Sequence, residues 1–68
     1  MTVVKVIELV GASKKSFDDA VKQALKEAAH TLHGISGVHV EGFNARVENN
    51  KITEYRANVK VAFVIERK

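Results

Sequence analysis

The sequence predicts an α+β domain of the order β-α-β-β, in which a three-stranded antiparallel sheet partly wraps around one helix. Three observations carry this prediction: an apolar, β-branched opening, one segment with helical spacing of apolar residues, and two alternating segments joined by an asparagine turn. The 68 residues are enough for a single domain, residues 1–68. A chain this short buries only about 60% of the surface that its unfolded form exposes, so its own core is marginal.

The first predicted strand is the segment TVVKVIELV, residues 2–10, which is apolar and β-branched on both parities. This pattern is typical of a strand that is covered on both faces. One face would meet the helix of the same chain. Because little of a 68-residue chain remains to cover the other face, we expect a neighbouring subunit to cover it.

The predicted helix spans residues 17–33. Ser16 followed three residues later by Asp19 predicts a capping box at its start, and Gly34 predicts a left-handed residue at its end. The apolar residues at helical spacing form one stripe that we expect to face the core: Phe17, Ala20, Val21, Ala24, Leu25, Ala28 and Leu32.

The second and third predicted strands, residues 38–48 and 52–66, form a long hairpin around the turn ENNK. In the second strand the apolar residues change parity at Gly42, which predicts a β-bulge there. The third strand alternates over about 15 residues, far more than the usual 5 or 6. One helix cannot cover a hairpin of this length, so the surplus face predicts assembly with other copies.

Composition excludes several classes of protein. The chain has no cysteine, which removes disulfides and thiol chemistry, and no segment approaches the roughly 18 apolar residues of a membrane span. The opening residues carry Lys5 and Glu8 within the apolar run, unlike a signal peptide. We therefore expect a soluble, cytoplasmic protein without a membrane partner. The net charge of +3 is spread along the chain and favours anionic ligands only mildly.

Catalytic and metal chemistry have little support in the sequence. The serines lie at cap and loop positions without a histidine and carboxylate in a known arrangement, so we expect no enzyme. His30 and His33 have a spacing that two metal ligands can use, but histidines in a last helical turn also suit the helix dipole. We therefore predict no metal site. Three hairpin carboxylates remain a second candidate, because a symmetric assembly can gather them around a cation: Glu41, Glu48 and Glu54.

Nucleic acid is a further partner to weigh for a basic chain. Arg46, Arg56 and Lys60 lie on the hairpin and can contact phosphates. The four aromatic residues, however, have parities or spacings that assign them to the core, which leaves no platform for stacking bases: Phe17, Phe43, Tyr55 and Phe63. We do not expect a nucleic-acid partner.

Three segments resemble the dodecin family, across nearly the full chain. They are IELVG at residues 7–11, SFDDA at residues 16–20 and YRANVKVAF at residues 55–63. The resemblance implies a hollow homododecamer that binds a small molecule, with riboflavin or FMN as the expected ligand. It also implies storage, buffering or sequestration of that ligand, without enzymatic turnover.

The resemblance implies a binding site that includes Gly37, Asn44 and Arg56. We expect Val38 and His39 to belong to it as well, because His39 has the opposite parity to Val38 and points away from the core toward a subunit interface or ligand. Three of these positions depart from the family pattern. Gly37 takes the place of the tryptophan that stacks on flavin, Arg56 that of a glutamine, and Asn44 that of an arginine that reaches the flavin phosphate. Loss of a stacking ring costs on the order of 1 to 3 kcal/mol, so flavin affinity falls steeply.

Two alternatives to a flavin site therefore stay open. Because Arg56 and His39 supply charge and hydrogen-bond donors, the site can favour another small anionic ligand. Alternatively, the site is lost and the assembled shell has a purely structural role.

Overall fold

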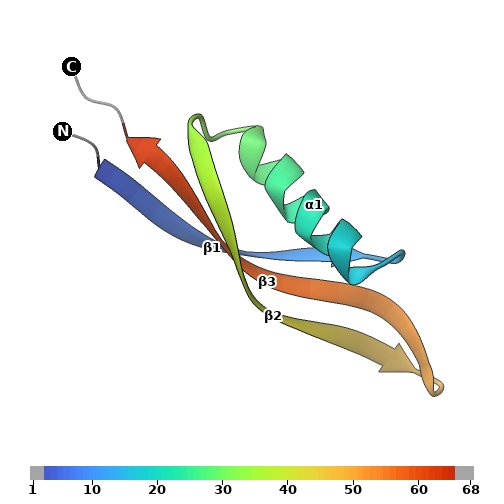
Figure 1. The fold of residues 1–68 in the computed structure, drawn as a ribbon. Helices are drawn as coiled ribbons and strands as arrows, with labels where there is room; N and C mark the ends of the chain where they lie inside the picture. The colour runs from blue at the N-terminus through green and yellow to red at the C-terminus, as the bar shows by residue number, and fades with distance from the viewer. Residues whose placement is uncertain (1–2, 66–68) are drawn as a thin grey trace.

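The computed structural model describes residues 3–65 and has the predicted order β-α-β-β (Figure 1). Strand β1 spans Val3–Ser13, helix α1 spans Phe17–Ala29, strand β2 spans Ile35–Glu48 and strand β3 spans Lys51–Ile65. The three strands form one antiparallel sheet in the order β1-β3-β2, and α1 lies against one face of it. The predicted fold class is thus confirmed. Thr2 and Glu66, the ends of two predicted strands, lie outside the described residues.

Strand β1 continues three residues beyond its predicted end. Gly11 and Ser13, expected in a loop, pair with Ala57 and Tyr55 of β3. Gly11 makes this possible, because a Cβ at its position would overlap the carbonyl oxygen of Ala20 in α1. A residue without a side chain is therefore required where this strand meets the helix.

The helix begins as predicted, but half of the predicted capping box is replaced. Ser16 is the N-cap, and its Oγ accepts a hydrogen bond of 3.0 Å from the Asp19 amide. The Asp19 carboxylate, expected to turn back toward Ser16, instead accepts a 2.6 Å hydrogen bond from the Ser13 hydroxyl. The hydrogen bond from Ser13 has the largest effect on the pKa of the Asp19 carboxyl and lowers it, whereas desolvation raises it. The net result is a pKa below the usual value. The loop between β1 and α1 is thereby fixed at both of its ends.

The helix ends at Ala29, four residues before the predicted end at His33. The amides of Thr31 and Leu32 both donate to the Ala28 carbonyl, at 3.2 and 2.9 Å, and the chain then turns toward the sheet. Gly34 does have the predicted positive φ, 73°, but it leads into β2 rather than capping the helix. Its carbonyl accepts from the Val64 amide at 3.0 Å, so β2 starts earlier than predicted.

The β2–β3 hairpin has the predicted turn and bulge. Glu48 pairs with Lys51, and Asn49 and Asn50 between them have φ values of 53° and 62°, as a two-residue type I′ turn requires. The pairing register shifts between Val40 and Gly42, where the bulge is predicted. Two further shifts, near Ser36 and Thr53, have no counterpart in the prediction.

The core is small and lies between α1 and the middle of β3. Its buried residues are mostly alanine, and the largest completely buried side chains among the described residues are Val59 and Val61. Alanines at every fourth position of the helix let its backbone approach the sheet closely. The buried core residues are Ala20, Ala24, Ala28, Ala57, Val59 and Val61.

Two residues predicted in the core lie at the surface. Leu25 is 37% exposed, because the alanine stripe, one position round the helix, faces the sheet instead. Phe43 is 51% exposed, although its ring centroid lies 5.1 Å from that of Phe17, which in turn packs edge-on against Tyr55 at 4.9 Å. This aromatic cluster lies where the hairpin passes the start of the helix.

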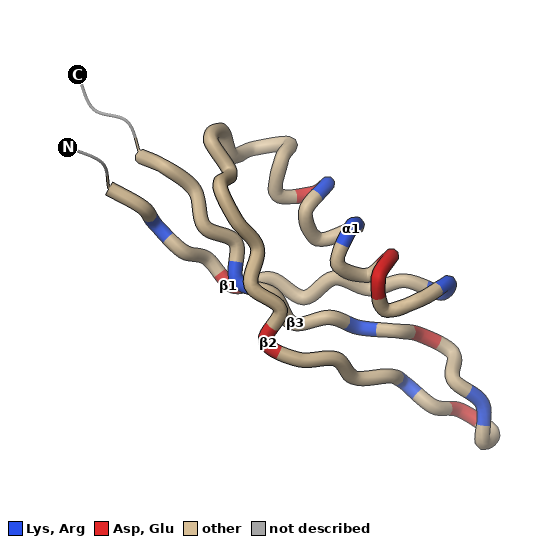
Figure 2. The backbone as a smooth tube through the Cα atoms, in the orientation of Figure 1, with Lys and Arg blue, Asp and Glu red and all other residues tan. Residues whose placement is uncertain are grey.

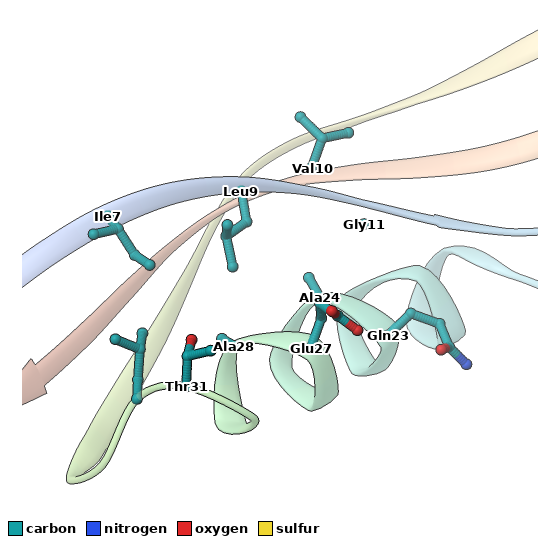
Figure 3. A pocket seen from close by; sticks show the side chains of 10 residues that line it. Ile7, Leu9, Val10, Gly11, Gln23, Ala24, Glu27, Ala28 and Thr31 are labelled. Atoms are coloured by element: carbon teal, nitrogen blue, oxygen red, sulfur yellow. The ribbon is translucent and has the colours of Figure 1, made fainter.

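The sheet has the surplus apolar surface that the sequence predicts. On β1, Ile7 and Leu9 point toward the helix, whereas Val10 points away from it (Figure 3). Val6 and Val10 are 51% and 65% exposed on this outer face. The far arm of the hairpin also extends beyond the helix (Figure 1) and exposes Val47 and Ile52. A single chain therefore leaves much of its apolar strand surface uncovered.

Candidate functional site

The five residues of the predicted site lie on the hairpin in two separate groups. Gly37, Val38 and His39 lie near the start of β2, whereas Asn44 lies beyond the bulge and pairs with Arg56 of β3. Asn44 lies seven positions after Gly37, which corresponds to about 23 Å at the rise of a regular β-strand. An arginine side chain cannot span this distance. One chain therefore does not bring the two groups together.

The Gly37 group lines a cavity of about 330 Å³ on the outer face of the sheet. This volume is at the lower end of the range of ligand pockets, about 300 to 1,000 Å³. The walls come from all three strands. They are formed by Val6, Gly37, Val38, His39, Lys60 and Ala62. We call this cavity the Gly37 pocket.

Gly37 has no steric reason to be glycine. A Cβ at this position would meet no atom within 4 Å, and its φ is not positive. A larger side chain would extend into open space beside the pocket. The glycine thus widens the pocket without serving the backbone, unlike Gly11, against which the helix packs.

The charged groups next to the pocket form a small network on the outer face. Lys60 Nζ lies 2.7 Å from Glu41 Oε1, and His39 Nε2 lies 3.9 Å from Glu41 Oε2. The hydrogen bond and charge of Lys60 lower the pKa of Glu41, and Glu41 in turn raises the pKa of Lys60. Glu8, the β1 partner of Lys60, adds to the second effect.

Arg56 is held within its own chain. Its Nε lies 2.6 Å from Glu54 Oε1, and the two side chains are 40% and 28% exposed. The remaining guanidinium nitrogens keep their donors. A ligand that binds the Arg56 guanidinium, as the sequence predicts, therefore competes with Glu54. Asn44 is exposed opposite Arg56.

Each hairpin carboxylate considered for a cation site has a basic partner. Glu41 pairs with Lys60 at 2.7 Å and Glu54 with Arg56 at 2.6 Å. Glu48 pairs in the same way with Arg46, at 3.1 Å. Basic and acidic residues accordingly alternate along the hairpin (Figure 2). Within residues 3–65 the structure contains no group of three metal-ligating side chains.

Three residues of the Gly37 pocket were not predicted: Val6, Lys60 and Ala62. Alternation along β3 does place Lys60 on the outer parity, but its partner across the hairpin depends on the register. That register shifts near Ser36 and near Gly42. With the register known, Lys60 falls opposite His39 and Ala62 opposite Gly37.

Two further cavities lined by described residues border the sheet. One, of about 570 Å³, shares Lys60 with the Gly37 pocket and also contacts Glu8 and Glu41. The other, of about 280 Å³, lies between β1 and α1 (Figure 3). Ile7 and Leu9 of β1 and Ala28 of α1 are among its apolar lining residues, and no residue pattern in the sequence indicates this cavity.

The fold and the pocket together define a class: small α+β proteins whose single helix lies on a long β-hairpin sheet. A family model described as Dodecin matches residues 3–66, and the chain belongs to the dodecin family. Dodecins are non-enzymatic binding proteins that assemble as homo-oligomers. The comparison with curated protein sequences gave no match.

Solved structures agree with this assignment. A protein from Thermus thermophilus is 28% identical, with a TM-score of 0.94 and full coverage of both chains. Dodecin from Streptomyces coelicolor is 25% identical, with a TM-score of 0.94 and coverage of 98% of this chain and 96% of that one. A calcium dodecin from Mycobacterium tuberculosis, described as having a novel calcium-binding site, is 28% identical at a TM-score of 0.83 and covers 97% and 94%.

No helix in the described part of the chain is long and apolar enough to cross a membrane.

Proposed function

We propose that this protein is a cytoplasmic homododecamer that stores, buffers or sequesters a small molecule, with riboflavin or FMN as the first candidate. The proposed unit is one dodecin-like domain over residues 1–68. The observation that carries the proposal is the Gly37 pocket, which is walled by apolar Val6 and Ala62 and contains the residue that the resemblance matches to the stacking tryptophan of the family. Family membership supports a small-ligand-binding assembly of this kind.

Assembly is supported by the surface that one chain leaves uncovered. Val4, Val6 and Val10 expose half or more of their surface on one face of β1. Assembly can also bring together the two groups of site residues that lie apart on one chain, because the Arg56 group of a second copy can approach the Gly37 pocket of the first. A complete site would then lie between copies.

The flavin site in this proposal is weak. Gly37 offers no ring for stacking, and Arg56 must leave Glu54 to contact a ligand. Stacking of a flat ring supplies about 1 to 3 kcal/mol per ring. Storage by such a site requires ligand concentrations well above those that a tryptophan-containing site needs.

Two experiments test the proposal. The mass in solution should be close to twelve times the 7.5 kDa chain, and a monomer or dimer in light scattering would contradict the assembly. Riboflavin and FMN titrated with the pure protein should lose fluorescence on binding. Unchanged emission at micromolar to millimolar protein would exclude flavin and leave another anionic ligand or a purely structural shell.

Calcium is not part of this proposal, although the related protein from Mycobacterium tuberculosis is described as a calcium dodecin. The pairing of Glu41, Glu48 and Glu54 with basic residues disfavours it in this chain. Calorimetric titration with calcium should therefore give no heat of binding at micromolar concentrations.

A further inference from the structure

The Gly37 pocket has a basic side chain whose role the proposed function does not assign. Lys60 lines the pocket together with His39, and none of the pocket's lining residues within 3–65 is a carboxylate. Glu41 and Glu8 instead line the neighbouring cavity, on the other side of Lys60. Lys60 thus lies at the boundary between a mainly apolar pocket and its two acidic neighbours.

The Lys60 ammonium has hydrogen-bond capacity to spare. An ammonium carries three donors, and the 2.7 Å contact with Glu41 uses one of them. Its side chain is 41% exposed, so a ligand can reach it. Glu41 and Glu8 keep this group charged, because both raise its pKa. Lys60 is therefore a charged group at the border of the pocket that is paired with Glu41 on one side and keeps donors for a ligand on the other.

We propose that Lys60 selects organic anions for the Gly37 pocket and that Glu41 is its built-in competitor. The ligand would be a flat, mainly apolar ring that rests against Val6 and Ala62, with an acidic substituent directed at Lys60. Glu41 occupies Lys60 when the pocket is empty and must share it when an anion binds. This inference rests on the proposed function, since it names the ligand class of the same pocket.

The apolar wall and the single cation together favour this class over others. A pocket of about 330 Å³ accommodates one compact ring system in a single chain. A neutral ring gains from burial against the wall but leaves the ammonium with Glu41. An anion gains from burial of its ring and also from a charge-assisted hydrogen bond to Lys60. Such a bond is roughly twice as strong as a neutral one.

Two fluorescent probes with the same ring framework test the proposal on the assembled protein. They are 8-anilinonaphthalene-1-sulfonate, which is anionic, and N-phenyl-1-naphthylamine, which lacks the sulfonate. Lys60→Gln should lower the affinity for the anionic probe about tenfold and leave the affinity for the neutral probe unchanged. Glu41→Gln should raise the affinity for the anionic probe several-fold, because the substitution removes the carboxylate that competes for the Lys60 ammonium.

Matched controls separate this contact from a change in net charge. Arg46 and Glu48 form an ion pair on the same hairpin, 3.1 Å apart, and neither lines the pocket. Arg46→Gln and Glu48→Gln should leave the affinity of both probes unchanged. The double variant of Glu41 and Lys60 should bind the anion as weakly as Lys60→Gln alone, because Glu41 acts through Lys60.

The outcomes distinguish this inference from the proposed function. Binding of both probes with no response to Lys60→Gln would overturn anion selection while leaving a small-ligand pocket in place. An equal response to Arg46→Gln would overturn it too, by assigning the effect to overall charge. Failure of both probes to bind the assembled wild-type protein would contradict the pocket itself, and with it both proposals. Light scattering on each variant verifies assembly.

Discussion

Gly37→Trp should restore a stacking platform to the pocket and tighten flavin binding. A side chain is sterically admissible there, since a Cβ would meet nothing within 4 Å. The backbone is extended strand with no positive φ, so a large aromatic residue suits it better than glycine. We therefore expect the variant to fold and assemble like the wild type.

The size of the effect follows from the stacking term. One aromatic ring stacked on a flat ligand contributes about 1 to 3 kcal/mol, which corresponds to a gain of about 5- to 150-fold in affinity. The measurement is a riboflavin titration followed by fluorescence, in which stacking on tryptophan should also deepen the quenching.

Gly42→Trp provides the matched control. Gly42 lies on the same strand, a Cβ there would also meet nothing within 4 Å, and the residue does not line the Gly37 pocket. It should bind riboflavin no better than the wild type. If Gly37→Trp gives no gain in an assembled protein, or if Gly42→Trp gives an equal one, the assignment of the pocket is wrong.

Three further substitutions test the fold. Gly11→Ala should lower stability by about 1 to 3 kcal/mol in chemical denaturation, because the new Cβ overlaps the carbonyl of Ala20. Ser13→Ala should raise the lowered pKa of Asp19 in an NMR titration. The stability that this bond contributes is present above the ordinary aspartate pKa, about 4. It is lost as pH falls through the lower pKa of the folded state, so the two proteins should converge in strong acid. Asn50→Ala should cost about 1 kcal/mol in thermal unfolding, since alanine resists the φ of 62°; equal stability would contradict the turn assignment.

The sequence was sufficient for the order of the elements, because each has a local cause. Period-2 alternation, helical spacing, the Ser16 cap and the asparagine turn depend on neighbouring residues alone. The bulge at Gly42 was also predictable, since the apolar parity changes there. Such features require no knowledge of the partner strand.

Features set by tertiary packing were not predictable. Leu25 fits the apolar stripe as well as the alanines do, and only the close approach of helix and sheet decides which of them is buried. The composition of the Gly37 pocket depends in the same way on strand register. That register placed Lys60 beside His39, so the sequence identified three residues of the pocket and missed the cation that borders it.

The alanine-rich core changes what burial means for mutational tolerance. In most domains the exposed positions accept substitution freely, and the large buried ones do not. Here the largest fully buried side chains among the described residues are two valines, whereas the bulkier apolar surface lies outside, on β1 and the hairpin. In the proposed assembly Val4 and Val10 would be buried against neighbouring copies, as core residues are in other domains. Selection on this chain would then act most strongly on side chains that look dispensable when one copy is viewed alone.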